Sequence, residues 1–491
     1  MPPGPFGSLR AISLAVAVAI LSGCRTPPRS FPSDVVRADI GRHCREATGG
    51  PALVAVTEHL LAGDLLERFY APRGFDAAWS RGGALSPDAD ALLAALGKAP
   101  EDGLRSDDYH HDRLAALATA ARRRVVDGES RTARARLLGS LDVLLTDAFF
   151  LYAAHLSKGK TDAQRGEPRW NIAETHADLP GLLATALKVR SVGETLDRLT
   201  PHHEYYRGLR RAREILGGQS PISRPESNAA SDQLRKIELN MDRWRSLPHD
   251  LGNPYVFVDV AGFELLVVET ARPIIRTRIV VGNAAWQTRD FSSEITHVVV
   301  NPYWNAPRHV LLAELIGYMR QDPNYLAANK MTLLRAVDGH EQPVDPATLD
   351  LAQVDATTLD FRLRQDPGSL NVLGRLLFRL PNPYNIYLHD TPYREDFEKS
   401  SRVFSHGCVR IERAEDVALF LLRQERGWGR ARLASVVATD KERVVTLTHP
   451  TPTHVAYLTA WADAAGRMRF VRDVYGRDAE FDAAFRQAPP R

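Results

Sequence analysis

A short loop in the last quarter of the chain combines the residue types that a thiol acyl-transfer site requires. It reads Ser405-His406-Gly407-Cys408-Val409-Arg410 and contains one of only three cysteines. Cysteine is a good nucleophile only as its thiolate, so a nearby base is needed. His406 is one candidate base, and His389, which follows the strand-like stretch Ile386 to Leu388, is the other. This combination predicts nucleophilic catalysis by Cys408.

The residues alone leave the choice between the two histidines open. Gly407 permits a tight turn, which would let the N–H groups of Gly407 and Cys408 point at a developing oxyanion. His406 would share a face with Cys408 in an extended segment, unless a turn at the glycine separates them. His389 could take the thiol proton and return it to a leaving amine, provided that a backbone carbonyl of one of the next two residues orients its ring.

Other interpretations of Cys408 explain less of the pattern. A lone cysteine is often a small buried hydrophobe, but here two histidines and a glycine accompany it. A zinc site would lack a fourth ligand at recognisable spacing, so we expect no metal. A papain-like protease would have its cysteine first and its histidine far downstream, the reverse of the order here. A disulfide with Cys44 would remove the nucleophile.

Length and composition indicate a multidomain globular protein. The 491 residues exceed the size at which one hydrophobic core keeps growing. Hydrophobic residues at 44% and charged residues at 25% are ordinary for a globular chain. A formal net charge of +3 is too small to indicate a nucleic-acid partner.

The first 24 residues have the pattern of an export signal. Arg10 precedes the apolar run Ala11 to Leu21, which is too short to span a bilayer. The run ends in Leu21-Ser22-Gly23-Cys24, which resembles the lipobox of bacterial lipoproteins, in which the cysteine carries the lipid. Arg25 follows, where an aspartate would favour the inner membrane, so we expect a periplasmic protein anchored to the outer membrane. A plain secretory signal is the alternative, and residues 25–50 are expected to form a tether.

The patterning then divides the chain into a helical half and a β-rich half. Residues 51–216 have helical periodicity, and 217–233 is a linker rich in glycine, serine and proline. From 234 to 440 the apolar period becomes that of strands, beginning with a hairpin over 255–269. Within it, residues from about 303 to 370 look like a helical insertion that caps a cleft. Residues 441–491 should supply strands that complete this domain.

The motif Tyr387-x-His389 followed by Ser405-His406-Gly407-Cys408 resembles the signature of the L,D-transpeptidases with a YkuD-type catalytic domain. Supporting similarities extend from about Leu234 to Gly476 and include Asn301-Pro302 and Trp304-Asn305-Ala306-Pro307. They are similar to the large Gram-negative members, which carry a helical scaffold before the catalytic domain. The resemblance implies a multidomain α+β fold, with an all-α scaffold followed by a β-sandwich-like catalytic domain.

The resemblance also implies a reaction on peptidoglycan stem peptides. Cys408 would attack diaminopimelate in one stem and release D-alanine, and the diaminopimelate amine of a neighbouring stem would resolve the thioester as a 3→3 cross-link. In that pattern His389 is the acid/base, Gly407 contributes a backbone N–H to the oxyanion site, and no cofactor is required. The residues expected to bind substrate are Tyr387, Ser405, His406, Arg410 and Trp304.

Two departures from the family pattern limit what it implies. The linker is too short for the small peptidoglycan-binding domain found in many large members, so docking would depend on the catalytic cleft and cap. Arg410 occupies a position that is often asparagine. Water or the lysine of another protein could also resolve the thioester, which would give a carboxypeptidase, an endopeptidase or a protein-anchoring enzyme. A non-catalytic wall-binding lipoprotein is the remaining alternative.

Overall fold

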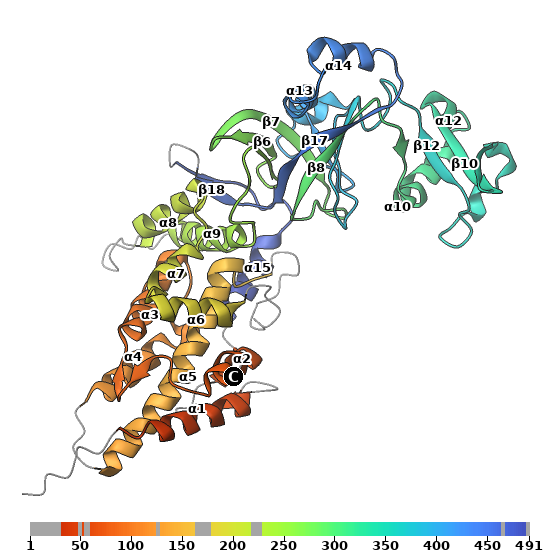
Figure 1. The fold of residues 1–491 in the computed structure, drawn as a ribbon. Coiled ribbons are helices and arrows are strands. Elements are labelled where there is room, and N and C mark those ends of the chain that lie inside the picture. Colours follow the sequence, from red (N-terminus) through yellow and green to blue (C-terminus); the bar gives the residue numbers. More distant parts are fainter. Residues whose placement is uncertain are drawn as a thin grey trace, which may run out of the picture.

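The structure is a computed structural model, and it describes residues 31–47, 52–53, 59–123, 128–162, 178–217, 228–462 and 467–487. The predicted signal peptide and Cys24 lie outside these residues. Figure 1 shows an elongated molecule with a helical half at one end and a β-rich half at the other. The predicted fold class, an α-helical scaffold followed by a β-rich domain, is confirmed.

The helical half is built around one long central helix, α5 (Gly128–Lys158). By length and composition α5 could cross a membrane, but 94% of its apolar window is buried inside the protein, as in a core helix. The side chain of Ser86 caps the helix that begins at Pro87, since it accepts a hydrogen bond from the N–H of Ala89. The other helices of this half are α1 (Ser33–Ala47), α2 (Asp64–Tyr70), α3 (Pro87–Gly97), α4 (His111–Arg122), α6 (Leu179–Val189), α7 (Val192–Arg198) and α8 (Glu204–Gly217).

The prediction of connecting segments is wrong at two places that the structure describes. Residues 33–47, expected to be part of a tether, form α1, because Val36, Ile40 and Cys44 recur at helical spacing and bury one face in the scaffold core. Residues 228–233, expected to be linker, already belong to α9 (Asn228–Arg245). Cys44 is buried in the scaffold core and Cys408 lies in the β-rich half, and neither cysteine is part of a disulfide, which contradicts a bond between them.

Helix α9 joins the two halves. Its Trp244 stacks on Phe257 of the β-rich half, with ring centroids 5.5 Å apart, and on Tyr205 of α8 at 5.7 Å. On its scaffold side the fully buried Asp242 accepts hydrogen bonds from the backbone N–H groups of residues 160 and 161 and from the guanidinium of Arg245. Apolar stacking on one side of α9 and the hydrogen bonds from residues 160 and 161 to Asp242 on the other therefore hold the β-rich half on the scaffold.

The β-rich half is a nine-stranded sheet that closes on itself. Its strand order is β15-β7-β16-β14-β13-β8-β17-β5-β6, and β6 also pairs with β7. The sandwich-like faces expected from the sequence are therefore parts of one continuous sheet around a single apolar core. The strands are β5 (Tyr255–Asp259), β6 (Glu264–Glu269), β7 (Arg272–Gly282), β8 (Phe291–Val300), β13 (Leu376–Arg379), β14 (Leu388–His389), β15 (Val403–Ser405), β16 (Val409–Ile411) and β17 (Arg443–Ala456).

The insertion predicted at about 303–370 is a separate small unit beside this sheet (Figure 1). The sequence predicted a helical insertion. The structure corrects this, because the insertion also has a four-stranded antiparallel sheet of order β11-β10-β12-β9. Helices and strands share one apolar core. The elements are β9 (Trp304–Asn305), α10 (Arg308–Val310), the π-helical turn η6 (Leu311–Leu315), α11 (Ile316–Gln321), α12 (Tyr325–Ala328), β10 (Met331–Val337), β11 (His340–Val344) and β12 (Arg362–Gln365).

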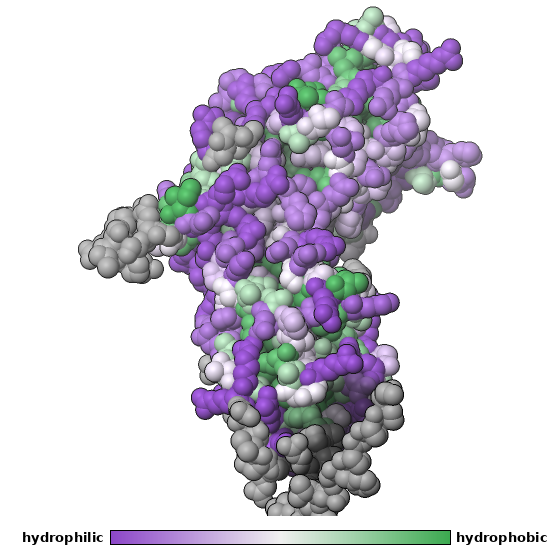
Figure 2. Space-filling view, turned by 60° about the vertical axis from the view of Figure 1, so that its left-hand side comes forward, coloured by the Kyte–Doolittle hydropathy of each residue, from purple (hydrophilic) through white to green (hydrophobic). Residues whose placement is uncertain are grey.

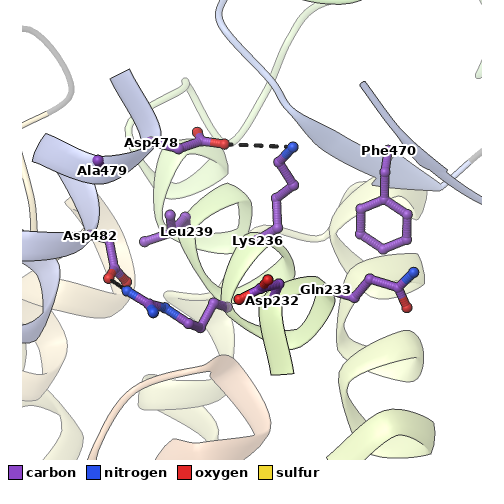
Figure 3. Close-up of a pocket in the computed structure, with 9 residues that line it drawn as sticks. Asp232, Gln233, Lys236, Leu239, Phe470, Asp478, Ala479 and Asp482 are labelled. Atoms are coloured by element: carbon purple, nitrogen blue, oxygen red, sulfur yellow. Dashed lines mark hydrogen bonds and ion pairs between the residues drawn. The ribbon is translucent and has the colours of Figure 1, made fainter. Parts of the chain in front are cut away.

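The C-terminal segment completes the sheet only in part. Strand β17 lies between β8 and β5, as expected, but β18 (Ala460–Ala462) and β19 (Met468–Phe470) form a sheet of their own. The last helix, α15 (Arg477–Arg486), returns to the scaffold and packs beside α9. Figure 3 shows this junction, where Lys236 pairs with Asp478 at 3.8 Å. The chain thus crosses between the two halves more than once.

One face of the molecule is mostly polar. Figure 2 shows hydrophilic side chains over most of one face and hydrophobic ones in small patches. Apolar side chains are instead concentrated in the scaffold core, the sheet core and the core of the insertion.

We predict that Asp242→Ala lowers the free energy of unfolding by about 3–5 kcal/mol, because it leaves the fully buried Arg245 without its ion-pair partner. Urea unfolding followed by far-UV circular dichroism measures the change. Glu194→Ala, which breaks an exposed pair with Arg198, is the matched control and should cost less than about 1 kcal/mol. Equal effects of the two substitutions would contradict the role given to the buried pair.

Candidate active site

The register of two neighbouring strands brings the predicted catalytic residues together. Strand β14 pairs in parallel with β16, with Leu388 opposite Val409 and His389 opposite Arg410. Leu388 and Val409 are fully buried in the sheet core. Because successive side chains alternate between the two faces of a sheet, Cys408, Arg410 and His389 lie on the opposite, outer face.

A turn held by two hydroxyl groups presents Cys408. Gly407 has φ +104°, a conformation that favours glycine. Its N–H donates to Ser405 Oγ at 3.1 Å, and Ser405 Oγ donates to the carbonyl of Cys408 at 2.5 Å. The carbonyl of Gly407 accepts from the buried Thr288 hydroxyl at 2.9 Å.

These bonds correct two predicted roles. The N–H of Gly407 is taken by Ser405, so it does not face an oxyanion, whereas the N–H of Cys408 has no partner in the described part of the chain. Ser405 is buried and uses its hydroxyl within the turn, so it shapes the loop and does not line a substrate cleft.

The environment of His389 makes it a neutral base. Its Nδ1–H donates to the carbonyl oxygen of Asp390 at 2.5 Å, which assigns the lone pair to Nε2. Burial lowers the pKa of His389 to about 3, and the positive charge of Arg410 adds to the effect, while hydrogen bonds to the backbone of Asp390 and Leu373 partly oppose it. The imidazole is therefore unprotonated at neutral pH and free to accept a proton.

Cys408 is a half-buried thiol beside one positive charge. Burial raises its pKa above the ordinary value, and a hydrogen bond from the backbone of Tyr387 and the charge of Arg410 lower it in part. Its Sγ lies 3.9 Å from the carbonyl oxygen of Asn385. The resting pair is thus a thiol and a neutral imidazole on one face of the sheet, an arrangement that suits a nucleophile with a general base.

Arg410 is held in place by an acidic residue that the sequence analysis did not identify. Its guanidinium lies 2.9 Å from Asp396 Oδ2, and Lys399 binds the other carboxylate oxygen at 2.7 Å. Arg410 also lies over the ring of Tyr393, 5.4 Å from its centroid. With these partners, Arg410 is a fixed positive charge near the thiol, and not a residue that reaches into open solvent for substrate.

His406 faces the insertion. Its Nε2 lies 2.8 Å from Glu314 Oε1 of the turn η6. Trp286, whose ring centroid is 6.3 Å from that of His406, stacks on His309 of α10 at 4.4 Å. These contacts connect the loop before Cys408 to the cap and give His406 a partner other than the thiol.

Two predicted substrate-binding aromatics lie on the outer face beside His389. Trp304 and Tyr387 pack on a small apolar cluster formed by Val299, Leu373 and Leu377. Leu377 is directly opposite His389 in the register of β13 with β14. Trp304 also packs against the core of the insertion, so it connects the cap to the catalytic face.

Five of the predicted site residues therefore lie on one face of the sheet: Cys408, His389, Tyr387, Arg410 and Trp304. Ser405 and His406 instead support the loop before the cysteine. Cys24 lies outside the described residues. Asp396 could have been suspected as the partner of Arg410, because the two side chains carry opposite charges. Thr288 and Glu314 gave no signal in the sequence, because they reach the loop only through the tertiary fold.

Comparisons with known proteins match both halves of the chain. Residues 64–212 match the family described as the scaffold domain, and residues 253–438 match the L,D-transpeptidase catalytic domain, YkuD. A curated protein of Haemophilus influenzae, provisionally named as an L,D-transpeptidase, is 34% identical over 254 residues. The aligned part covers 52% of this chain and 50% of that relative, so the chain spans about half the relative's length in the match.

We predict that Arg410→Gln raises the pKa of Cys408 further and slows its alkylation at neutral pH by about threefold for each pKa unit, since a more basic thiolate is also more nucleophilic. Peptide-resolved mass spectrometry after iodoacetamide labelling measures the rate across pH. Lys399→Gln removes a cation from the same carboxylate but not from the thiol, and should leave the rate unchanged. Faster alkylation of Arg410→Gln would contradict this account.

Proposed function

Since the chain carries an L,D-transpeptidase catalytic domain at residues 253–438 behind a scaffold domain at residues 64–212, we propose that it is a peptidoglycan L,D-transpeptidase with Cys408 as its nucleophile. The observation that carries the proposal is the parallel pairing of β14 with β16, which puts Cys408 and the neutral His389 on one face. The proposed product is a 3→3 cross-link between two diaminopimelate residues.

In the acylation step His389 Nε2 takes the proton of the Cys408 thiol as Sγ attacks the carbonyl carbon of diaminopimelate in a tetrapeptide stem. The C–S bond forms as the carbonyl oxygen gains negative charge, which the free N–H of Cys408 stabilises. The C–N bond then breaks, and the proton on His389 passes to the nitrogen of the departing D-alanine. The enzyme is left as a thioester with a neutral histidine.

In the second step an amine resolves the thioester. The side-chain amine of diaminopimelate on a neighbouring stem attacks the thioester carbon, His389 accepts a proton from it, and the C–S bond breaks as the new amide forms. The proton returns to Cys408. Each step uses only groups of the chain and its two substrates, so the proposal includes no cofactor.

The assignment of His389 as the base has independent support. His406 points its Nε2 at Glu314 of the cap, whereas His389 shares the outer face with Cys408 and has one nitrogen fixed by the carbonyl of Asp390. Because burial lowers its pKa to about 3, the His389 ring stays unprotonated at neutral pH. Activity should therefore show no loss between pH 7 and about pH 5 from protonation of this group.

The acyl acceptor decides which product the thioester gives. Water in place of the amine would make the same thioester chemistry a carboxypeptidase or endopeptidase, and a lysine of another protein would make it an anchoring reaction. We favour the diaminopimelate amine because Trp304 and Tyr387 pack on a small apolar cluster beside His389, and apolar surroundings at the thioester disfavour attack by water.

We also propose that the protein works in the periplasm, attached to the outer membrane by a lipid on Cys24. The support is the apolar run that ends in Leu21-Ser22-Gly23-Cys24, followed by Arg25. Metabolic labelling with a radioactive fatty acid tests it, since Cys24→Ala should abolish incorporation.

We predict that Cys408→Ala abolishes turnover of a disaccharide tetrapeptide and that His389→Gln lowers kcat by about 10²–10⁴, the usual contribution of a general base. Mass spectrometry of the released D-alanine and of the dimeric product measures both. His406→Gln is the matched control, and should cost less because that ring supports the loop from the cap side. A larger loss in His406→Gln than in His389→Gln would overturn the choice of base.

A further inference from the structure

A groove of about 290 Å³ lies on the outer face of the sheet, and one of its lining residues, Asn385, contacts the nucleophile. Its wall includes Asn385, whose carbonyl oxygen lies 3.9 Å from Cys408 Sγ, and Tyr387. At the other end are Arg379 and His297. The remaining lining residues are Thr296, Leu380, Pro381 and Asn382. A substrate that reaches the thiol from this side lies along the groove.

Strand register aligns one residue from each of four strands in a row along this groove. Tyr387 continues the β14–β16 register opposite Cys408 and the β13–β14 register opposite Arg379. Arg379 in turn is opposite His297 of β8. Neighbouring strands are about 4.8 Å apart, so the Cα of Arg379 is roughly 10 Å from that of Cys408.

Arg379 is a positive charge without an ion-pair partner among the described residues. Its guanidinium has no hydrogen bond or ion pair with any described residue, and its side chain is exposed. Arg375, four residues earlier, is by contrast paired with Asp440. A guanidinium offers a planar fork of donors that matches a carboxylate, and an arginine without a protein partner on a groove wall is suited to an anionic ligand.

We propose that Arg379 binds a carboxylate of the donor stem peptide and thereby positions the peptide for attack by Cys408. This inference rests on the proposed function and names how its donor is recognised. A peptide extends about 3.5 Å per residue, and an arginine side chain reaches roughly 6–7 Å, so a carboxylate within two residues of the attacked carbonyl is in range. The terminal carboxylate of D-alanine and the carboxylates upstream of the scissile bond share this chemistry.

The test measures binding of a synthetic stem tetrapeptide to the full chain carrying Cys408→Ala, so that no turnover is required. Adding Arg379→Gln should raise Kd at least about tenfold, because a charge-assisted hydrogen bond is lost. Arg379→Lys should recover part of the affinity. Arg432→Gln, which removes an equally exposed cation on α14 (Arg430–Val437), is the matched control and should leave Kd unchanged.

Amidated peptides distinguish the two sources of the carboxylate. If Arg379 binds the terminal carboxylate, a peptide ending in a carboxamide should bind the Cys408→Ala chain with and without Arg379→Gln equally. If Arg379 binds an upstream carboxylate, the Kd values of the two chains should become equal only for the peptide amidated at that upstream carboxylate. An unchanged Kd in Arg379→Gln, or the same weakening for every peptide, would overturn the proposal.

Failure of this inference and failure of the proposed function have different signatures. The proposed function fails if the unsubstituted enzyme releases no D-alanine. The inference fails if the enzyme turns over or binds the peptide but Arg379→Gln has no selective effect on Kd, or if the parent chain does not bind the peptide. Circular dichroism of each variant checks that the exposed substitution leaves the fold intact.

Discussion

The parallel pairing of β14 with β16 is the constraint on which the rest of the site depends. Leu388 and Val409 are both buried in the sheet core, and a slip of one residue in either strand would move them to the surface. The hydrophobic effect therefore fixes the register, and the register in turn fixes that Cys408 and His389 emerge on the same outer face. The packing of the sheet core therefore also determines how the two catalytic residues are placed.

Burial then determines how those two groups work. A half-buried thiol and a buried imidazole both avoid charge, so the resting state is neutral, and Arg410 adds a fixed positive charge that favours the thiolate over an imidazolium. Asp396 holds that arginine, and the turn at Gly407 is held by Thr288 and Ser405. The loop before Cys408 also contacts the cap through His406 and Glu314, which makes the cap part of the loop's support.

The sequence predicted the features that depend on residues close together in the chain. The helical and β-rich halves and the strand that delivers His389 follow from the periodicity of residues near one another in sequence. What the sequence did not reveal depends on contacts between distant segments. The helix α1 in the supposed tether packs on α5, the last helix returns to the scaffold, and Ser405 takes the N–H expected for an oxyanion. Each needs the tertiary fold before it can be recognised.

The central claim is that Cys408 carries the acyl group. Intact-protein mass spectrometry after brief exposure to a tetrapeptide stem tests it most directly, with fragmentation to locate the adduct. We expect a gain equal to the mass of the stem minus that of D-alanine, located on Cys408 and reversed by an added amine. Release of D-alanine with no adduct on Cys408, or an adduct on another residue, would contradict it.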